Sequence, residues 1–162
     1  MKFACKAVDL AYLDIAPLQF RNEIVIDAAA ESVFAVLEDG NSWPKWFKDI
    51  ANIEWTTPKP FGVGTKRTIK MHTQLVADEE FFVWKQGKEF AFYFTYTNLP
   101  VVNALCEHYY LEPLGENQCK FTYRIGAELM FPTTLLAPIA NILLGNMFEK
   151  GTKSLAKYMK EK

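Results

Sequence analysis

The feature that most constrains the fold of this chain is a change of hydrophobic period near Thr133. Before it, from about residue 50, apolar and polar residues alternate as they do in antiparallel strands. After it, apolar residues recur at helical spacing to the last residues of the chain. An antiparallel sheet of this length has to cover one face, and a single helix about 10 Å across is the only long element available. The groove between them is therefore either plugged by bulky side chains or left partly hollow.

The elements expected on either side of this change form a single domain. Residues 1–19 show little periodicity and are predicted to be an N-terminal arm, whereas residues 20–162 are long enough to build one core. Whether the arm pairs with the sheet is left open. The predicted strands span residues 20–27, 53–56, 65–71, 73–85, 88–97, 104–114 and 118–131, and two short helices span residues 29–38 and 42–47.

The final helix is predicted to press an apolar stripe onto the sheet. Pro138 either opens this helix or kinks it, and Gly151 lies on the stripe, where a side chain would press on the sheet. The stripe consists of Leu135, Ile139, Ile142, Leu143, Met147, Leu155 and Tyr158.

The last hairpin can be aligned from its own residues. In the register that pairs Tyr109 with Tyr123, apolar pairs fall on one face of the hairpin. The same register pairs Glu112 with Lys120 on the other face, where opposite charges stabilise each other in water. The alternation therefore predicts both the pairing of these strands and the face that points to the core.

Three short stretches carry a resemblance to a known family. They are Ile24–Ala28 leading into Glu31–Phe34, Trp43–Trp46, and Tyr110–Gly115 before the last strand. Together with the order of elements, they resemble the START/SRPBCC helix-grip superfamily, in particular its polyketide cyclase/dehydratase and lipid-transport branch. The resemblance covers about residues 20–160. It implies an α+β helix-grip fold, in which a curved antiparallel sheet wraps around the long C-terminal helix and leaves a ligand cavity between them.

Aromatic side chains gather in one predicted hairpin, within residues 73–97. Phe90, Phe92, Phe94 and Tyr96 occupy alternate positions, so they are expected to line one face of the sheet together. Any single ring can simply fill the core, but the face as a whole is interpreted as the wall of an apolar pocket. The residues predicted to contact a ligand are Phe34, Trp43, Trp46, Arg67, Phe90, Phe92, Phe94, Tyr96, Glu107, Tyr109, Tyr123, Ile125 and Met147.

Three polar side chains are candidates for chemistry in such a pocket, namely Glu107, Arg67 and Tyr123. By alternation Glu107 points inward, and an isolated inward carboxylate needs a partner. Arg67 or a tyrosine hydroxyl would supply one, so these groups form either the polar end of a pocket or a structural ion pair. In contrast, the segment Asp78–Glu80 is interpreted as a solvated strand end, and His108 is expected to face outward.

Composition and missing motifs exclude several classes of function. A formal net charge of −1 argues against nucleic-acid binding, which needs an excess of Lys and Arg. Cys5, Cys106 and Cys119 form no CxxC pair, so no disulfide framework, metal site or cofactor is predicted. Because no secretory signal and no spanning apolar run is found, the chain is expected to be cytoplasmic and not to insert stably into membranes. The oligomeric state is left open between monomer and dimer.

Three hypotheses of function remain at this point. The first is a binding module that encloses a small or medium hydrophobic molecule, such as a lipid, an isoprenoid or a polyketide-like compound. The second is an enzyme of cyclase or dehydratase type, in which Glu107 is the general base and Arg67 or Tyr123 stabilises an enolate. The third is a protein-interaction role, such as that of a quinone-handling chaperone, which some branches of the resembled superfamily show.

Overall fold

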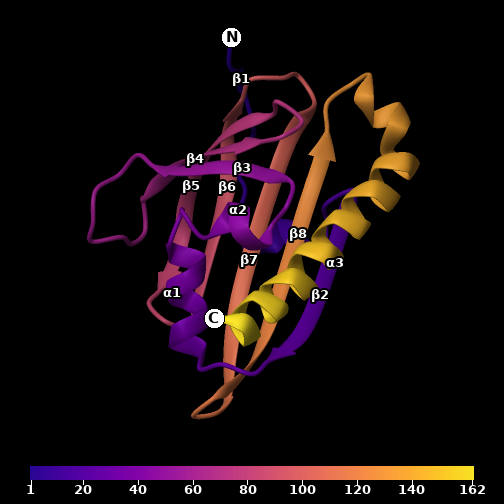
Figure 1. Ribbon diagram of the computed structural model, residues 1–162. Helices are drawn as coiled ribbons and strands as arrows, with labels where there is room; N and C mark the ends of the chain where they lie inside the picture. The colour runs from indigo at the N-terminus through magenta and orange to yellow at the C-terminus, as the bar shows by residue number, and fades with distance from the viewer.

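Eight antiparallel strands form one curved sheet in the computed structural model, which describes residues 1–162 (Figure 1). The sheet order is β2-β8-β7-β6-β5-β4-β3, and β1 pairs with β6 outside this path. The strands are β1 (Phe3–Ala4), β2 (Leu18–Ile26), β3 (Ile50–Trp55), β4 (Lys66–Met71), β5 (Val76–Lys85), β6 (Glu89–Thr97), β7 (Val102–Gly115) and β8 (Gln118–Leu129).

The helices lie on the inner face of this sheet. The long helix α3 (Ala137–Glu161) runs beside β2, and the short helices α1 (Ala30–Glu38) and α2 (Trp43–Trp46) cover the other end of the groove (Figure 1). Two 3₁₀ turns, η1 (Leu10–Asp14) and η2 (Thr133–Leu136), precede β2 and α3. The predicted α+β helix-grip fold is therefore confirmed. Pro138 stands in the first turn of α3, where its missing N–H has no intrahelical partner to lose, so it opens the helix.

The register predicted for the last hairpin is confirmed from Ala104 to Pro113, and it shifts by one residue at each end. Tyr109 lies opposite Tyr123, and Glu112 lies opposite Lys120 with 3.0 Å between Oε2 and Nζ. Cys106 faces Gly126 in the same register. Since the inner face of β7 and β8 carries the apolar members of these pairs, the alternation alone was sufficient to orient both strands.

The N-terminal residues pack against the sheet. Phe3 and Ala4 pair with β6, and Leu13 and Ala16 are buried on the outer face of β8. A Cβ atom at Gly126 would lie 3.0 Å from the Cβ of Ala16, so only glycine lets η1 approach this closely. The first long strand accordingly begins at Leu18, two residues before the predicted start.

The prediction that Tyr96 lies on the inner face is wrong. Asp78 pairs with Tyr96 and Glu79 with Phe94, so Thr95 is an extra residue in β6. Such a bulge reverses the alternation beyond it. Tyr96 is therefore 44% exposed on the outer face, where the amino group of Lys2 lies 5.6 Å from its ring.

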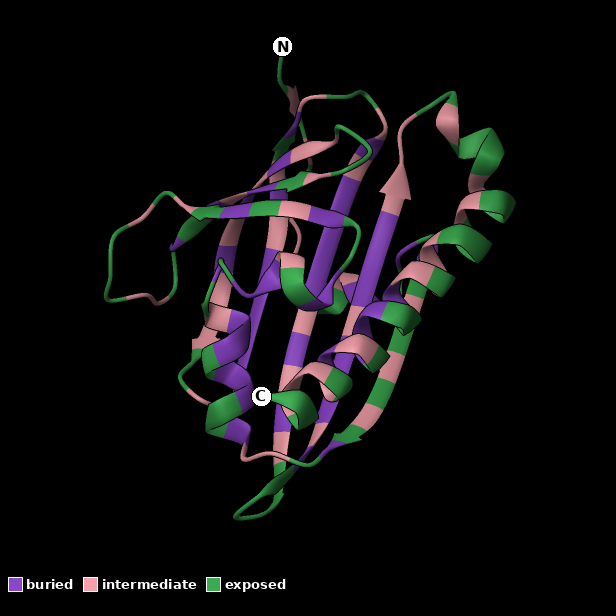
Figure 2. Ribbon diagram, in the orientation of Figure 1, coloured by how far each residue is buried: buried purple, intermediate pink, exposed green.

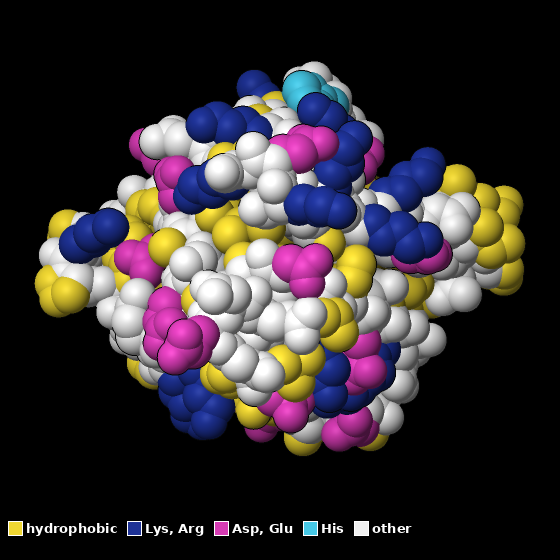
Figure 3. Space-filling view, turned by 60° about the horizontal axis from the view of Figure 1, so that its bottom comes forward, with side chains coloured by type: hydrophobic (Ala, Val, Ile, Leu, Met, Phe, Trp, Pro, Cys, Tyr) yellow, Lys and Arg dark blue, Asp and Glu magenta, His cyan; other side chains and the backbone are white.

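The predicted stripe of α3 packs over only part of its length. Leu155 is fully buried, whereas Leu135, Ile139 and Ile142 are 59–74% exposed. Figure 2 shows the first half of α3 as exposed or intermediate, and Figure 3 shows hydrophobic side chains at the right edge of the view, where this half lies. The reason is that the face α3 turns toward the groove carries Ala140, Leu144 and Met147, so Ile139 and Ile142 lie on the solvent side of the helix. Gly151, in the second half, meets the Phe47 ring, not the sheet.

Candidate functional site

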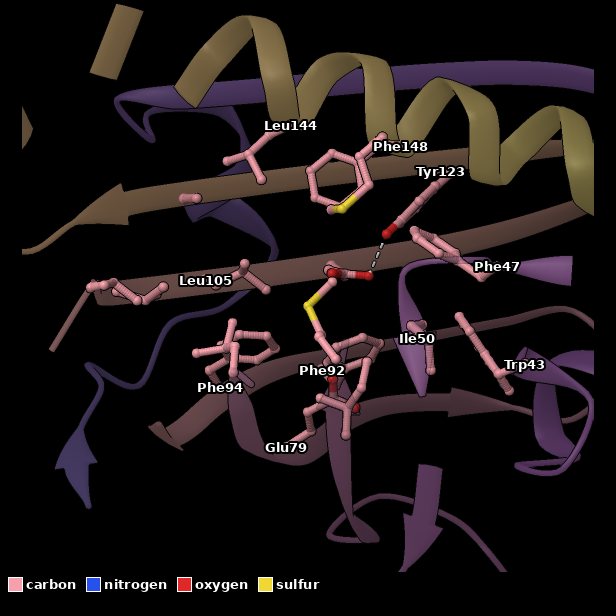
Figure 4. A pocket seen from close by; sticks show the side chains of 18 of the residues that line it. Trp43, Phe47, Ile50, Glu79, Phe92, Phe94, Leu105, Tyr123, Leu144 and Phe148 are labelled. Carbon is pink, nitrogen blue, oxygen red and sulfur yellow. Dashed lines mark hydrogen bonds between the residues drawn. The ribbon is translucent and has the colours of Figure 1, made fainter. Parts of the chain in front are cut away.

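A cavity of about 320 Å³ lies between the inner face of the sheet and α3 (Figure 4). Of its 23 lining residues, 20 are hydrophobic. On the helix the lining residues include Ala140, Leu144 and Met147, which share one face because they are three to four positions apart. Leu143 also lines the cavity although it is 63% exposed, so the cavity opens to solvent beside the first half of α3.

Eight of the predicted ligand contacts line this cavity, and five do not. Those that line it are Trp43, Arg67, Phe92, Phe94, Glu107, Tyr109, Tyr123 and Met147. Those outside it are Phe34, Trp46, Phe90, Tyr96 and Ile125.

The residues outside the cavity, other than Tyr96, are buried in the core. Phe34 from α1 packs on Phe90 with 5.5 Å between ring centroids, and both rings contact Trp84. Trp46 packs against Trp43 at 4.6 Å, and Ile125 is 1% exposed beside Glu107. Aromatic rings thus plug the end of the groove that α1 covers, and only the remainder is hollow. Alternation assigns residues to a face of the sheet but cannot say how far along the groove the plug extends.

One charged pair lies at the bottom of the cavity. Nε of Arg67 donates a hydrogen bond to Oε2 of Glu79, the residue opposite it in the β4–β5 register. Both side chains are 1% exposed. The interpretation of Asp78–Glu80 as a solvated strand end is therefore wrong for Glu79, which points inward as Ala77 and Phe81 do. Figure 4 shows Glu79 directed toward the cavity below Phe92.

Aromatic rings surround the Arg67 guanidinium. Its central carbon lies 4.7 Å from the centre of the Phe92 ring and 5.0 Å from those of Trp43 and Phe81. These faces attract the cation but accept no strong hydrogen bond. Nη1 of Arg67 is buried and has no hydrogen-bond partner, which costs free energy unless another molecule supplies an acceptor.

Glu107 is the second buried carboxyl group of the cavity, and two tyrosines hold it. The hydroxyls of Tyr109 and Tyr123 donate to the same oxygen, Oε2, over 2.6 Å and 2.7 Å. In Figure 4 a dashed line marks the hydrogen bond that the Tyr123 hydroxyl makes inside the cavity. Because neither bond uses Oε1, this oxygen is left for a further partner. The three predicted polar residues, Glu107, Arg67 and Tyr123, therefore line one cavity.

Burial controls the protonation of both carboxyl groups. Removal from water raises the pKa of Glu79 to about 7, although the Arg67 charge opposes the shift. Removal from water likewise raises the pKa of Glu107, against the two tyrosine hydrogen bonds and the more distant Arg67. Glu79 can thus hold or release a proton near neutral pH, and Glu107 holds its proton more tightly than an exposed carboxyl group does; shifts of this kind are typical of acid–base residues.

The remaining candidate side chains stand elsewhere. His108 faces outward as predicted, and its Nε2 lies 2.7 Å from Oε2 of Glu89. No cluster of three or more His, Cys, Asp or Glu side chains that could hold a metal ion occurs. None of the helices combines the length and the apolar character that crossing a bilayer requires.

Comparison with known proteins agrees with this geometry. A family model described as "Polyketide cyclase / dehydrase and lipid transport" matches residues 17–160. The chain belongs to this family. Rv2574 of Mycobacterium tuberculosis and Mb2604 of Mycobacterium bovis are each 31% identical to it over 156 residues, covering 96% of this chain and 93% of the relative.

Solved structures with the same fold are more distant in sequence. A START superfamily protein from Mycobacterium smegmatis superposes with a TM-score of 0.75 at 14% identity, covering 88% of this chain and 97% of that one. The Zhui aromatase/cyclase from Streptomyces sp. R1128 superposes with a TM-score of 0.70 at 10% identity, covering 88% and 93%. At these identities the likeness shows the shared fold alone.

Of the 23 lining residues the sequence prediction missed 15, and Glu79 is the only charged one among them. The signal was present, because Ala77, Glu79 and Phe81 occupy alternate positions with two apolar members. Aligning β4 with β5 by the method used for the last hairpin would have placed Glu79 opposite Arg67. The run of three acidic residues hid this pattern.

Proposed function

We propose that the protein binds a small or medium hydrophobic molecule, of lipid, isoprenoid or polyketide-like character, in the cavity between the sheet and α3. The observation that carries the proposal is the cavity itself, with its 20 hydrophobic lining residues out of 23. An apolar hollow of about 320 Å³ falls within the range of small-molecule sites. Filling it removes apolar surface from water on both the ligand and the protein.

The polar groups of the cavity give the ligand an orientation. Arg67, Glu79 and Glu107 are the only lining residues that are not hydrophobic. Arg67 and Glu79 come from the adjacent strands β4 and β5, and Glu107 comes from β7, which β6 separates from β5. A ligand that enters beside Leu143 would place its apolar part against α3 and its polar atoms at these groups. Few polar groups in an apolar pocket are the usual arrangement for fixing how a ligand lies.

The test combines detection of the ligand with blocking of the cavity. Native mass spectrometry of freshly purified protein is expected to show a bound apolar species. Ala140→Trp places a large side chain at the cavity wall and is expected to remove that species. Ile142→Trp is the matched control, because Ile142 lies two positions away on the same helix, is 64% exposed and does not line the cavity. Wild-type protein that stays empty across a panel of lipids and polyketide-like compounds contradicts the proposal.

A second function, catalysis of cyclase or dehydratase type, is favoured by one specific observation. Glu107 has a raised pKa, a free Oε1 and two tyrosine hydroxyls on Oε2, within the same cavity as the Arg67 guanidinium. In this role Glu107 takes a proton from a carbon next to a substrate carbonyl, and Arg67 or Tyr123 stabilises the resulting enolate oxygen. Glu107→Gln keeps the shape of the side chain and is expected to abolish turnover. Unchanged turnover of a genuine substrate removes Glu107 from the mechanism.

A further inference from the structure

Acidic side chains outnumber basic ones at the polar end of the cavity. One guanidinium, from Arg67, faces two carboxyl groups, from Glu79 and Glu107, and no other charged side chain lines the cavity. Glu79 already occupies Nε of Arg67. A single carboxylate neutralises the guanidinium, so the second acid has no cation of its own.

Several polar atoms at this end make no hydrogen bond within the protein, and two of them belong to Arg67 and Glu107. Nη1 of Arg67 is a donor with no acceptor. Oε1 of Glu107 receives neither tyrosine hydrogen bond, since both go to Oε2. A carbonyl oxygen that reaches the guanidinium accepts a hydrogen bond from it, and a hydroxyl group can accept from Arg67 or donate to Glu107. The site therefore matches an oxygen atom that brings no negative charge.

We propose that the cavity selects apolar molecules whose polar end is an uncharged carbonyl or hydroxyl group over the corresponding carboxylates. This inference rests on the proposed binding function and names the chemical class of its ligand. A ligand carboxylate would be a third acidic group beside one guanidinium, in surroundings that solvate ions poorly. It must displace Glu79, acquire a proton or remain unpaired, and each of these weakens its binding.

Matched ligands with the same ten-carbon chain test the selection directly. Binding of decan-1-ol, 2-decanone, decanoate and decane to the full-length protein is measured by isothermal titration calorimetry at pH 8, below micelle-forming concentrations. Decan-1-ol and 2-decanone are expected to bind about tenfold or more tightly than decanoate. They are also expected to bind more tightly than decane, because only they carry an oxygen atom that can hydrogen-bond to Arg67 or Glu107.

Removing one acid at a time distinguishes charge from shape. In Glu79→Gln the guanidinium loses its carboxylate, so decanoate is expected to take that place and the preference to reverse. In Glu107→Gln one acid fewer opposes the anion, and the preference for decan-1-ol is expected to shrink without reversing. Glu112→Gln is the control, because Glu112 pairs with Lys120 on the outer face and is expected to leave the preference unchanged.

The outcomes separate this inference from the proposed function. Decanoate binding as tightly as decan-1-ol to the wild type, or all four ligands binding equally, overturns the selection but leaves an apolar binding site. The absence of binding by any of the four overturns both. If Glu79→Gln fails to fold, Glu107→Gln still tests the selection. An unchanged preference of that variant for decan-1-ol over decanoate contradicts the role of the second acid.

Discussion

Replacing Arg67 with methionine tests whether the buried charges are arranged as described. Methionine keeps much of the side-chain volume but leaves Glu79 buried at 1% exposure with no cation beside it. Breaking a buried ion pair from one side costs about 3 to 5 kcal/mol. For a chain of this length that corresponds to a melting temperature lower by about 10 °C.

The loss should depend strongly on pH, and the sign follows from the carboxyl group. Without Arg67 the pKa of Glu79 in the folded state rises further above its ordinary value of 4.5. A carboxyl group whose pKa is higher in the folded than in the unfolded state stabilises the protein at low pH. This stabilisation is lost as the pH rises through the pKa of the folded state. The cost of Arg67→Met is therefore expected to reach about 3 to 5 kcal/mol at pH 8 and only about 1 kcal/mol at pH 5, where Glu79 is protonated when folded.

Urea unfolding at pH 5 and pH 8 measures both values. The double variant Arg67→Met with Glu79→Gln is the control, because it removes the stranded charge and is expected to recover at least half of the loss at pH 8. A loss that is the same at both pH values, or a double variant no more stable than the single one, would refute the reasoning.

Three further predictions follow from the same structure. In the wild type, raised pKa values of Glu79 and Glu107 make the free energy of unfolding fall between pH 5 and pH 8, and Glu107→Gln should flatten this slope in urea titrations. Gly151→Ala brings a Cβ to 2.6 Å from the buried Phe47 ring and should cost about 1 to 3 kcal/mol, whereas Gly145→Ala meets Phe20 at 3.6 Å and should cost nothing. Burial raises the pKa of Cys106 to about 12 and that of Cys119 to about 11. Both thiols should therefore resist alkylation at pH 8 until denaturant is added, and rapid labelling of either thiol in the native protein contradicts their placement.

Local alternation was enough to predict most of the fold. Between Ala104 and Pro113 in β7, and between Cys119 and Glu128 in β8, one register places most apolar residues on the inner face and the pair Glu112–Lys120 on the outer face. The same alternation placed Glu107, Tyr109 and Tyr123 on the inner face. The change to a helical period at the end of the chain determined which element closes the groove.

Other features depended on contacts between distant segments. The bulge at Thr95 reverses the direction of Tyr96, and nothing in the alternation of β6 announces an extra residue. The pairing of Glu79 with Arg67 depends on the alignment of two strands, not on the acidic run in which Glu79 stands. These are pairwise properties, and a single strand read by itself does not contain them.

What the sequence by itself determined is which residues face inward and that one long helix must cover them. How much of the groove stays hollow was decided only in three dimensions, where Phe34, Phe90 and Trp84 fill one end and small Ala127 and Ala140 leave space at the other. The physical reason is that a cavity is the difference between the volume a backbone encloses and the volume its side chains occupy. The enclosed volume depends on the curvature of the whole sheet, which no local pattern records.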